Sequence, residues 1–258
     1  YDIIVFNRSF NDFSNIAFRG NSYETLEAYA RKVETRVDTK TRVETRTIIS
    51  SPDELAAATL EGFTVTEDML GNYSQTTYGR TAPSRSSEET PDGLYHLHFV
   101  PKKLTREVSA VLHIEGLNNI RSATCRLGGV AESIFLATGK TSANTVTQEF
   151  TPSNPEFSPG SPFNGTLSCE FEIFGLNVID NNNLHLDALL VDGKTEFEGD
   201  CTNVKITEND DGTGSITLIL EASTEKVPDV KPEGGAGSGF DVDVDGWGNE
   251  INTDIPIN

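Results

Sequence analysis

The chain has 258 residues, of which 36% are hydrophobic, and it carries a formal net charge of -20. This apolar content is too high for a disordered chain, and the length allows one large or two ordinary folded domains. A strongly acidic surface repels phosphate backbones and anionic lipid head groups, so the composition argues against nucleic-acid binding and membrane-surface binding.

The N-terminal hundred residues show mixed patterns. An apolar strand is expected over residues 1–7 and a short helix over 22–31, with Ser22 as its cap and Leu26 and Tyr29 facing inward. Residues 33–47 alternate Val or Thr with charged residues, which predicts an exposed strand or strand pair near a sheet edge. A second helix is expected over 51–62, because Ser51, Pro52 and Glu54 form a favourable helix start.

Residues 74–93 are polar and rich in Ser, Thr and Pro, which indicates a long loop and a candidate domain boundary. After it, short strands separated by turn signals predict an antiparallel β-sandwich. Asp192-Gly193 and Asp211-Gly212 are expected at hairpin tips. The expected strands cover residues 94–100, 108–114, 122–130, 133–138, 146–150, 165–174, 185–191, 201–207 and 215–220.

A linker rich in Pro and Gly is expected over residues 224–239, followed by a strand-like tail over 240–258. In the tail, apolar residues alternate with acidic ones, so that one face of an extended strand is apolar. The candidate strand-donor residues are Phe240, Val242, Val244, Trp247, Ile251, Ile255 and Ile257.

Two patterns suggest metal ligands, and in both cases a structural interpretation is preferred. Residues 241–246 (DVDVDG) resemble the start of a calcium loop, but the twelfth position is Asn252 instead of glutamate, which favours an acid-faced strand. His96 and His98 share one strand face, and His113 or Glu115 could supply a third ligand. Side chains of these types are common on strand faces, so no metal site is predicted.

The three cysteines are Cys125, Cys169 and Cys201, with no CxxC pair and no short Cys/His spacing. They are expected to be unpaired small hydrophobic residues in β-structure, with one disulfide as the alternative in an oxidising compartment. The sequence contains no motif of nucleophilic, metal-dependent or phosphate-binding chemistry, since GGAGSG at 234–239 has no strand-to-helix context. We therefore expect no catalytic residues, no cofactor and no enzymatic activity.

No run approaches the roughly 18 apolar residues of a membrane-spanning helix. The chain opens without Met and already within a β-like run, so the natural start of the protein is expected to precede Tyr1.

Several segments together resemble a Bacteroidales family of surface lipoproteins related to fimbrillins and Mfa-like anchor proteins. The resemblance spans almost the whole chain and is most specific in the terminal motif. The segments that carry it are YDIIVFN, FRGNSYETLEAY, SPDELAA with EGFTVTEDM, EVSAVLHIEGLNNIRSATCRLGGVAESI, and GFDVDVDGWGNEINTDIPI.

This resemblance implies an all-β protein built from two tandem Greek-key, transthyretin-like β-sandwiches. With the composition shifts, the expected domains are residues 1–100, with short helices, and residues 101–223, followed by the linker and the tail. The resemblance also implies export to the cell surface or outer membrane, anchoring by a lipid that this chain lacks, and assembly with other fimbrial subunits by strand donation.

Three functions are kept as hypotheses. The first is a fimbrial or adhesin-type structural subunit or anchor that assembles by β-strand addition. The second is a surface lipoprotein that does not polymerise and binds a glycan or a host protein. The third is an exported hydrolase, which would need a deep pocket with a perturbed carboxylate.

Overall fold

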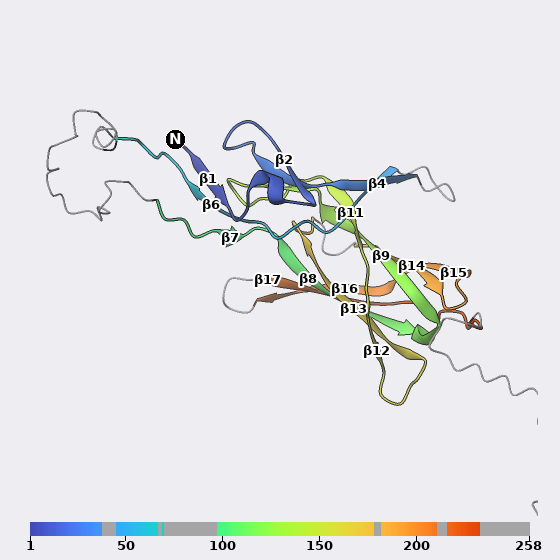
Figure 1. Ribbon diagram of the computed structural model, residues 1–258. Coiled ribbons are helices and arrows are strands. Elements are labelled where there is room, and N and C mark those ends of the chain that lie inside the picture. Colours follow the sequence, from blue (N-terminus) through green and yellow to red (C-terminus); the bar gives the residue numbers. More distant parts are fainter. Residues whose placement is uncertain (38–44, 67–68, 70–96, 178–181, 211–215, 233–258) are drawn as a thin grey trace, which may run out of the picture.

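The computed structural model describes residues 1–37, 45–66, 69, 97–177, 182–210 and 216–232 (Figure 1). Within these residues the regular secondary structure consists of strands, β1 to β17, with short 3-10 turns at η1 (Phe10–Asp12) and η3 (Leu117–Asn119). The prediction of an all-β protein is therefore confirmed. No helix in the described part of the chain is long and apolar enough to cross a membrane.

Two large sheets form the body of the molecule. The six-stranded sheet has the order β15 (Glu196–Asp200), β14 (Leu184–Leu190), β9 (Ile120–Ala131), β11 (Thr145–Phe150), β5 (Thr45–Ile49) and β4 (Lys32–Val37). The five-stranded sheet has the order β12 (Asn154–Phe157), β13 (Asn164–Ile173), β8 (Arg106–Glu115), β17 (Ile216–Ser223) and β16 (Thr202–Asp210).

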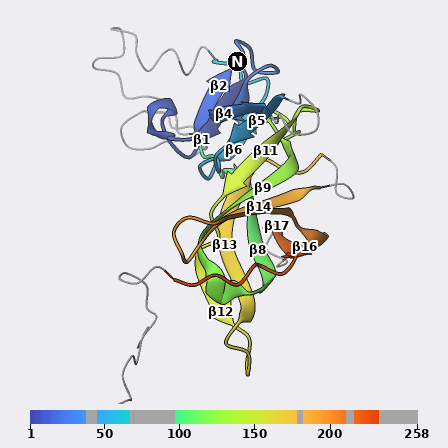
Figure 2. The same cartoon turned by 90° about the vertical axis from the view of Figure 1, so that its right-hand side faces the viewer.

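Two small sheets complete the fold and lie mainly in the N-terminal part. One has the order β1 (Ile3–Phe6), β6 (Ala56–Leu60) and β7 (Lys102–Lys103). The other has the order β10 (Ser133–Phe135), β3 (Glu27–Ala30) and β2 (Ile16–Arg19). These N-terminal strands and the β12–β13 hairpin lie at opposite ends of the molecule in both views (Figures 1 and 2).

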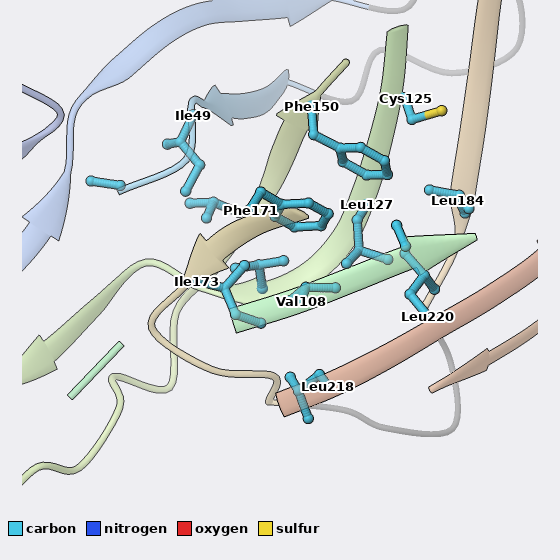
Figure 3. Close-up of a cluster of buried hydrophobic side chains, with 14 of the residues drawn as sticks. Ile49, Val108, Cys125, Leu127, Phe150, Phe171, Ile173, Leu184, Leu218 and Leu220 are labelled. Atoms are coloured by element: carbon cyan, nitrogen blue, oxygen red, sulfur yellow. The ribbon is translucent and has the colours of Figure 1, made fainter. Parts of the chain in front are cut away.

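The two large sheets pack face to face because their strands alternate apolar and polar residues. Every second residue of β14, from Leu184 to Leu190, is buried, while the residues between them are only half-buried. Between the sheets, Phe150 of β11 stacks on Phe171 of β13, with ring centroids 4.3 Å apart (Figure 3). The rings are nearly parallel, at 16°, so they join the two sheets by direct contact as well as by burial.

The strand pairing is mixed. Most neighbours are antiparallel, as predicted, but β17 pairs with β8 and β11 pairs with β5 in parallel. Because β5 precedes residue 50 and β11 follows residue 140, the six-stranded sheet contains strands from both sides of the predicted domain boundary. Ile49 of β5 is buried in the same core cluster as Phe150 and Phe171 (Figure 3).

The helix predicted over 22–31 is wrong. Residues 22–25 form a turn, in which the amide of Leu26 donates to the carbonyl of Ser22, and Ala28 and Ala30 then lie in strand β3. Both alanines are fully buried while their neighbours Glu27 and Tyr29 are half-buried, so the segment has the period of a strand. Pairing with β2 and β10 outweighs the helix propensity of the segment.

The helix predicted over 51–62 is also wrong, because residues 56–60 form β6 and pair with β1. The hydroxyl of Ser51 does not cap a helix. It accepts a hydrogen bond from the amide of Glu172 at 2.9 Å, and thereby ties this segment to β13. Leu55 is completely buried, so tertiary contacts decide the conformation of this alanine-rich segment.

Other strand predictions are confirmed with small shifts, one needs correction, and strands β2, β7, β12 and β15 were not predicted. Residues 97–100, the described part of the strand expected over 94–100, have no regular structure. Strands β12 and β15 were missed, because β12 contains Pro155 and β15 is rich in acidic residues. The hairpin at Asp192-Gly193 is confirmed: β14 pairs with β15, and Gly193 has the positive φ of 70° that this turn requires.

Two further predictions concern the strand pair over residues 33–47 and the linker over residues 224–239. The strand pair is confirmed as β4 and β5, with β4 at the end of its sheet. In the first part of the predicted linker, Val227 is completely buried, and its amide donates to the carbonyl of Glu115. Residues 224–227 therefore follow the end of β8 before the chain reaches the glycine-rich segment.

Candidate functional site

The outer face of β9, β14 and β15 gathers charged residues in rows. In β14 the inward residues are apolar, whereas His185, Asp187 and Leu189 point to the other face. The register places Asp187 opposite Thr124 of β9 on one side and Glu198 of β15 on the other. Strand pairing therefore brings together side chains that are far apart in the sequence.

Arg126 lies on β9 and links the two strands that flank it. Its Nε donates to Oε2 of Glu149 on β11 at 3.0 Å, and its Nη1 donates to Oδ2 of Asp187 on β14. The guanidinium is largely shielded, with 16% of the side chain exposed, so screening by solvent is weaker than at an open surface. Arg126 thus holds β11 and β14 in register across β9.

His185 is held between two carboxylates. Its Nδ1 lies 2.8 Å from Oδ1 of Asp200, and its Nε2 lies 3.2 Å from Oδ1 of Asp187. Asp200 lies directly opposite His185 in the strand register. One ligand atom each from His185, Asp187 and Glu198 lies within 4.8 Å of the others, which makes this trio a candidate cation site.

A shallow depression of about 260 Å³ adjoins this trio. Its polar lining combines Arg126 with Asp187, Glu196 and Glu198, and the hydroxyls of Ser122 and Thr124. The depression is open and mostly polar, unlike the enclosed apolar pockets that hold most small-molecule substrates. It could take a small polar group or a hydrated ion at the surface.

The ends of the two large sheets are a second functional feature. An end strand carries a row of backbone N–H and C=O groups without a strand partner on one side, and these groups can pair with an added strand. Of the four end strands, β12 contains Pro155, which has no N–H to donate, and β15 carries Glu196, Glu198 and Asp200. The remaining ends are β4 and β16.

A third feature is the turn of the β12–β13 hairpin, which projects from one end of the molecule (Figure 1). Phe157 and Phe163 flank this turn, with 48% and 60% of their surface exposed. Two exposed aromatic side chains beside one projecting turn form a candidate contact surface. The turn between them contains Pro159, Gly160 and Pro162.

The three cysteines are free, as predicted. Cys125 is buried, and burial raises the pKa of its thiol well above the ordinary value. Burial also raises the pKa of Cys169 and Cys201 to about 11. All three are therefore protonated at neutral pH and behave as small core residues rather than as nucleophiles.

The predicted site residues have different outcomes. The strand-donor residues of the tail, the calcium-like segment 241–252 and His96 lie outside the described residues. His98 and His113 are both exposed, and neither belongs to a metal-ligand group among the described residues. The trio at His185 was missed, because its members come from two strands and form no local motif.

The class of protein follows from these observations: an all-β protein with open sheet ends and polar outer faces. The chain belongs to the family described as a domain of unknown function, DUF5119, whose model matches residues 1–151. No curated protein sequence matches the chain.

Among solved structures, the chain is similar to a crystal structure of a candidate adhesin from Bacteroides ovatus. The two share 16% sequence identity with a TM-score of 0.48, over 78% of this chain and 64% of that one. This chain thus spans less than two thirds of that protein.

Proposed function

We propose that this protein is a cell-surface, adhesin-type subunit or anchor of a fimbrium, and that it assembles by β-strand addition. The observation that carries the proposal is the combination of open sheet ends with an alternating C-terminal segment. A strand from one molecule would satisfy the free backbone groups at the sheet end of another. The proposal includes the Greek-key, transthyretin-like sandwiches, the export to the outer membrane and the lipid anchor that the sequence resemblance implies.

Charge favours β4 as the acceptor. The tail carries Asp241, Asp243 and Asp245 between its apolar residues, so it is repelled by an acidic end strand. Strands β12, β15 and β16 each carry more acidic than basic residues, whereas β4 has two basic residues and one acidic residue. Among the end strands of the two large sheets, only β4 offers the tail both a full set of amides and a positive charge balance.

The energetics make the added strand a reversible contact. Full burial of Phe240, Val242 and Val244 would contribute on the order of 5–8 kcal/mol. Ordering the backbone of five residues costs roughly 5–10 kcal/mol, which nearly cancels that gain. The ladder hydrogen bonds and the local concentration of a partner therefore decide whether the strand adds.

The test is deletion of residues 236–258, with the mass of the assembly measured by analytical ultracentrifugation. We expect the intact chain to form oligomers and the truncated chain to be monomeric with an unchanged fold. Val242→Asp should release the tail, and Val65→Asp, at an exposed valine in the N-terminal part, is its matched control. If intact and truncated chains have the same mass and stability, strand addition by the tail is wrong.

A second candidate function rests on the exposed aromatic turn. Phe157 and Phe163 could stack on the apolar face of a sugar or insert into a host protein, in a chain that does not polymerise. In that case Phe157→Ala and Phe163→Ala would each weaken binding to glycan arrays or host-cell extracts, while deletion of the tail would leave binding unchanged.

A further inference from the structure

We propose that His185, Asp187 and Glu198 bind a zinc ion on the outer face of the β14–β15 hairpin. This site is independent of the proposed strand addition at β4, since its residues lie on β14 and β15 and none belongs to β4 or the tail. The four polar residues involved, His185, Asp187, Glu198 and Asp200, occupy one face of a two-stranded ribbon in matching register.

The spacing of the ligand atoms fits a shared ion. Two atoms that each lie about 2.1 Å from one zinc ion are separated by about 3.0 Å at a right angle and about 3.4 Å at the tetrahedral angle. The distance from Nε2 of His185 to Oδ1 of Asp187 is 3.2 Å, which falls within this interval. Glu198 is exposed, and one of its carboxylate oxygens lies within 4.8 Å of one ligand atom of His185 and one of Asp187.

The surrounding contacts orient both half-buried ligands. Asp200 binds Nδ1 of His185, so the proton of a neutral imidazole stays on Nδ1 and the lone pair of Nε2 points toward Asp187. Arg126 donates to Oδ2 of Asp187, and Oδ1 of Asp187 faces the histidine. Carboxylates that hold a histidine in this way are common behind the zinc ligands of proteins.

Three protein ligands leave at least one zinc coordination position for water or for an atom of another molecule. The depression next to the trio offers room for such an atom, since Asp187 and Glu198 belong to the trio and also line the depression. Zinc fits the ligand set better than calcium or magnesium, because both of those prefer oxygen ligands alone.

The experiment is isothermal titration calorimetry of the metal-free chain of residues 1–258 with zinc chloride at neutral pH. We expect one equivalent to bind, His185→Ala and Glu198→Gln to abolish binding, and Asp200→Asn to weaken it about 10–100-fold. His113→Ala is the control, because His113 is an exposed histidine on another strand, two residues before Glu115. Circular dichroism and melting temperature establish that each variant is folded.

A second titration in about 0.5 M salt distinguishes a coordinated zinc ion from ions that the net charge of -20 attracts to the surface. Salt strongly screens the attraction of the surface ions but weakens direct coordination much less. One equivalent that persists in salt and depends on His185 supports the proposal. Binding that is equal in the wild type and His185→Ala, several weak equivalents that disappear in salt, or no binding at all would overturn it. Each of these results leaves the strand-addition proposal untouched.

Discussion

The stacked pair of Phe150 and Phe171 joins the two large sheets by direct contact of their rings. Only 6% and 7% of these residues is exposed, and their rings lie 4.3 Å apart between β11 and β13. Phe171→Ala removes a buried ring and leaves a cavity that rigid strands on both sides fill poorly. The free energy of unfolding should therefore fall by about 3–5 kcal/mol, a large part of the roughly 5–15 kcal/mol that stabilises a typical domain.

A double-mutant cycle separates the stacking from the burial. Phe150→Ala, Phe171→Ala and the double variant are unfolded in urea and followed by far-UV circular dichroism. The coupling energy should be about 0.5–1.5 kcal/mol, the value typical of an aromatic pair. Phe157→Ala is the control, since this exposed residue should change stability by less than about 0.5 kcal/mol. A loss of under about 1 kcal/mol for Phe171→Ala would refute the packing of these sheets on each other.

Three further predictions concern separate parts of the fold. Arg126→Met should lower the free energy of unfolding by about 1–3 kcal/mol in low salt, and a loss that does not shrink in high salt would contradict an electrostatic role for Arg126. Iodoacetamide at pH 8 should modify Cys169 and Cys201 about 100-fold more slowly in the folded than in the urea-unfolded chain, because burial raises the pKa of each thiol from 9.0 to about 11 and leaves less thiolate. The difference between the folded and unfolded modification rates should narrow as the pH rises toward about 11. Equal modification rates of the two forms, measured by mass spectrometry, would be inconsistent with the burial of these thiols. Gly165→Ala should lower the free energy of unfolding by about 1–3 kcal/mol, because a Cβ at this position would overlap the carbonyl oxygen of Glu156 on β12. Gly199→Ala is the control in the same urea assay and should be close to neutral, because no atom lies nearer than 3.6 Å to its added Cβ.

The sequence predicted most strands of the C-terminal part because each has its own local signal. In β8 and β14 every second position is apolar over seven residues, and the turns between strands carry Asp-Gly or Pro-Gly pairs. The N-terminal part was harder. Ala28 and the alanines of β6 favour a helix locally, and only pairing with β2 and β1 makes them strands.

The candidate sites show the same difference between local and long-range information. The alternation of residues 240–244 is visible in the sequence, so a strand-like tail could be predicted, although it lies outside the described residues. The trio of His185, Asp187 and Glu198 could not be predicted from the sequence, because Glu198 reaches His185 only through the register of the β14–β15 hairpin. The contact of Arg126 with Glu149 and Asp187 likewise depends on the order of three strands in one sheet.

Hydrogen exchange at β4 tests the proposed strand addition most directly. The intact chain and the chain lacking residues 236–258 are compared by mass spectrometry at equal concentration, with peptides covering β4 (Lys32–Val37), β12 and β16. Strand addition at β4 predicts faster exchange of the β4 amides in the truncated chain, no change at β12 and β16, and recovery of protection when a peptide of residues 240–258 is added. Identical exchange at β4 in both chains, with no effect of the peptide, would contradict strand addition at β4.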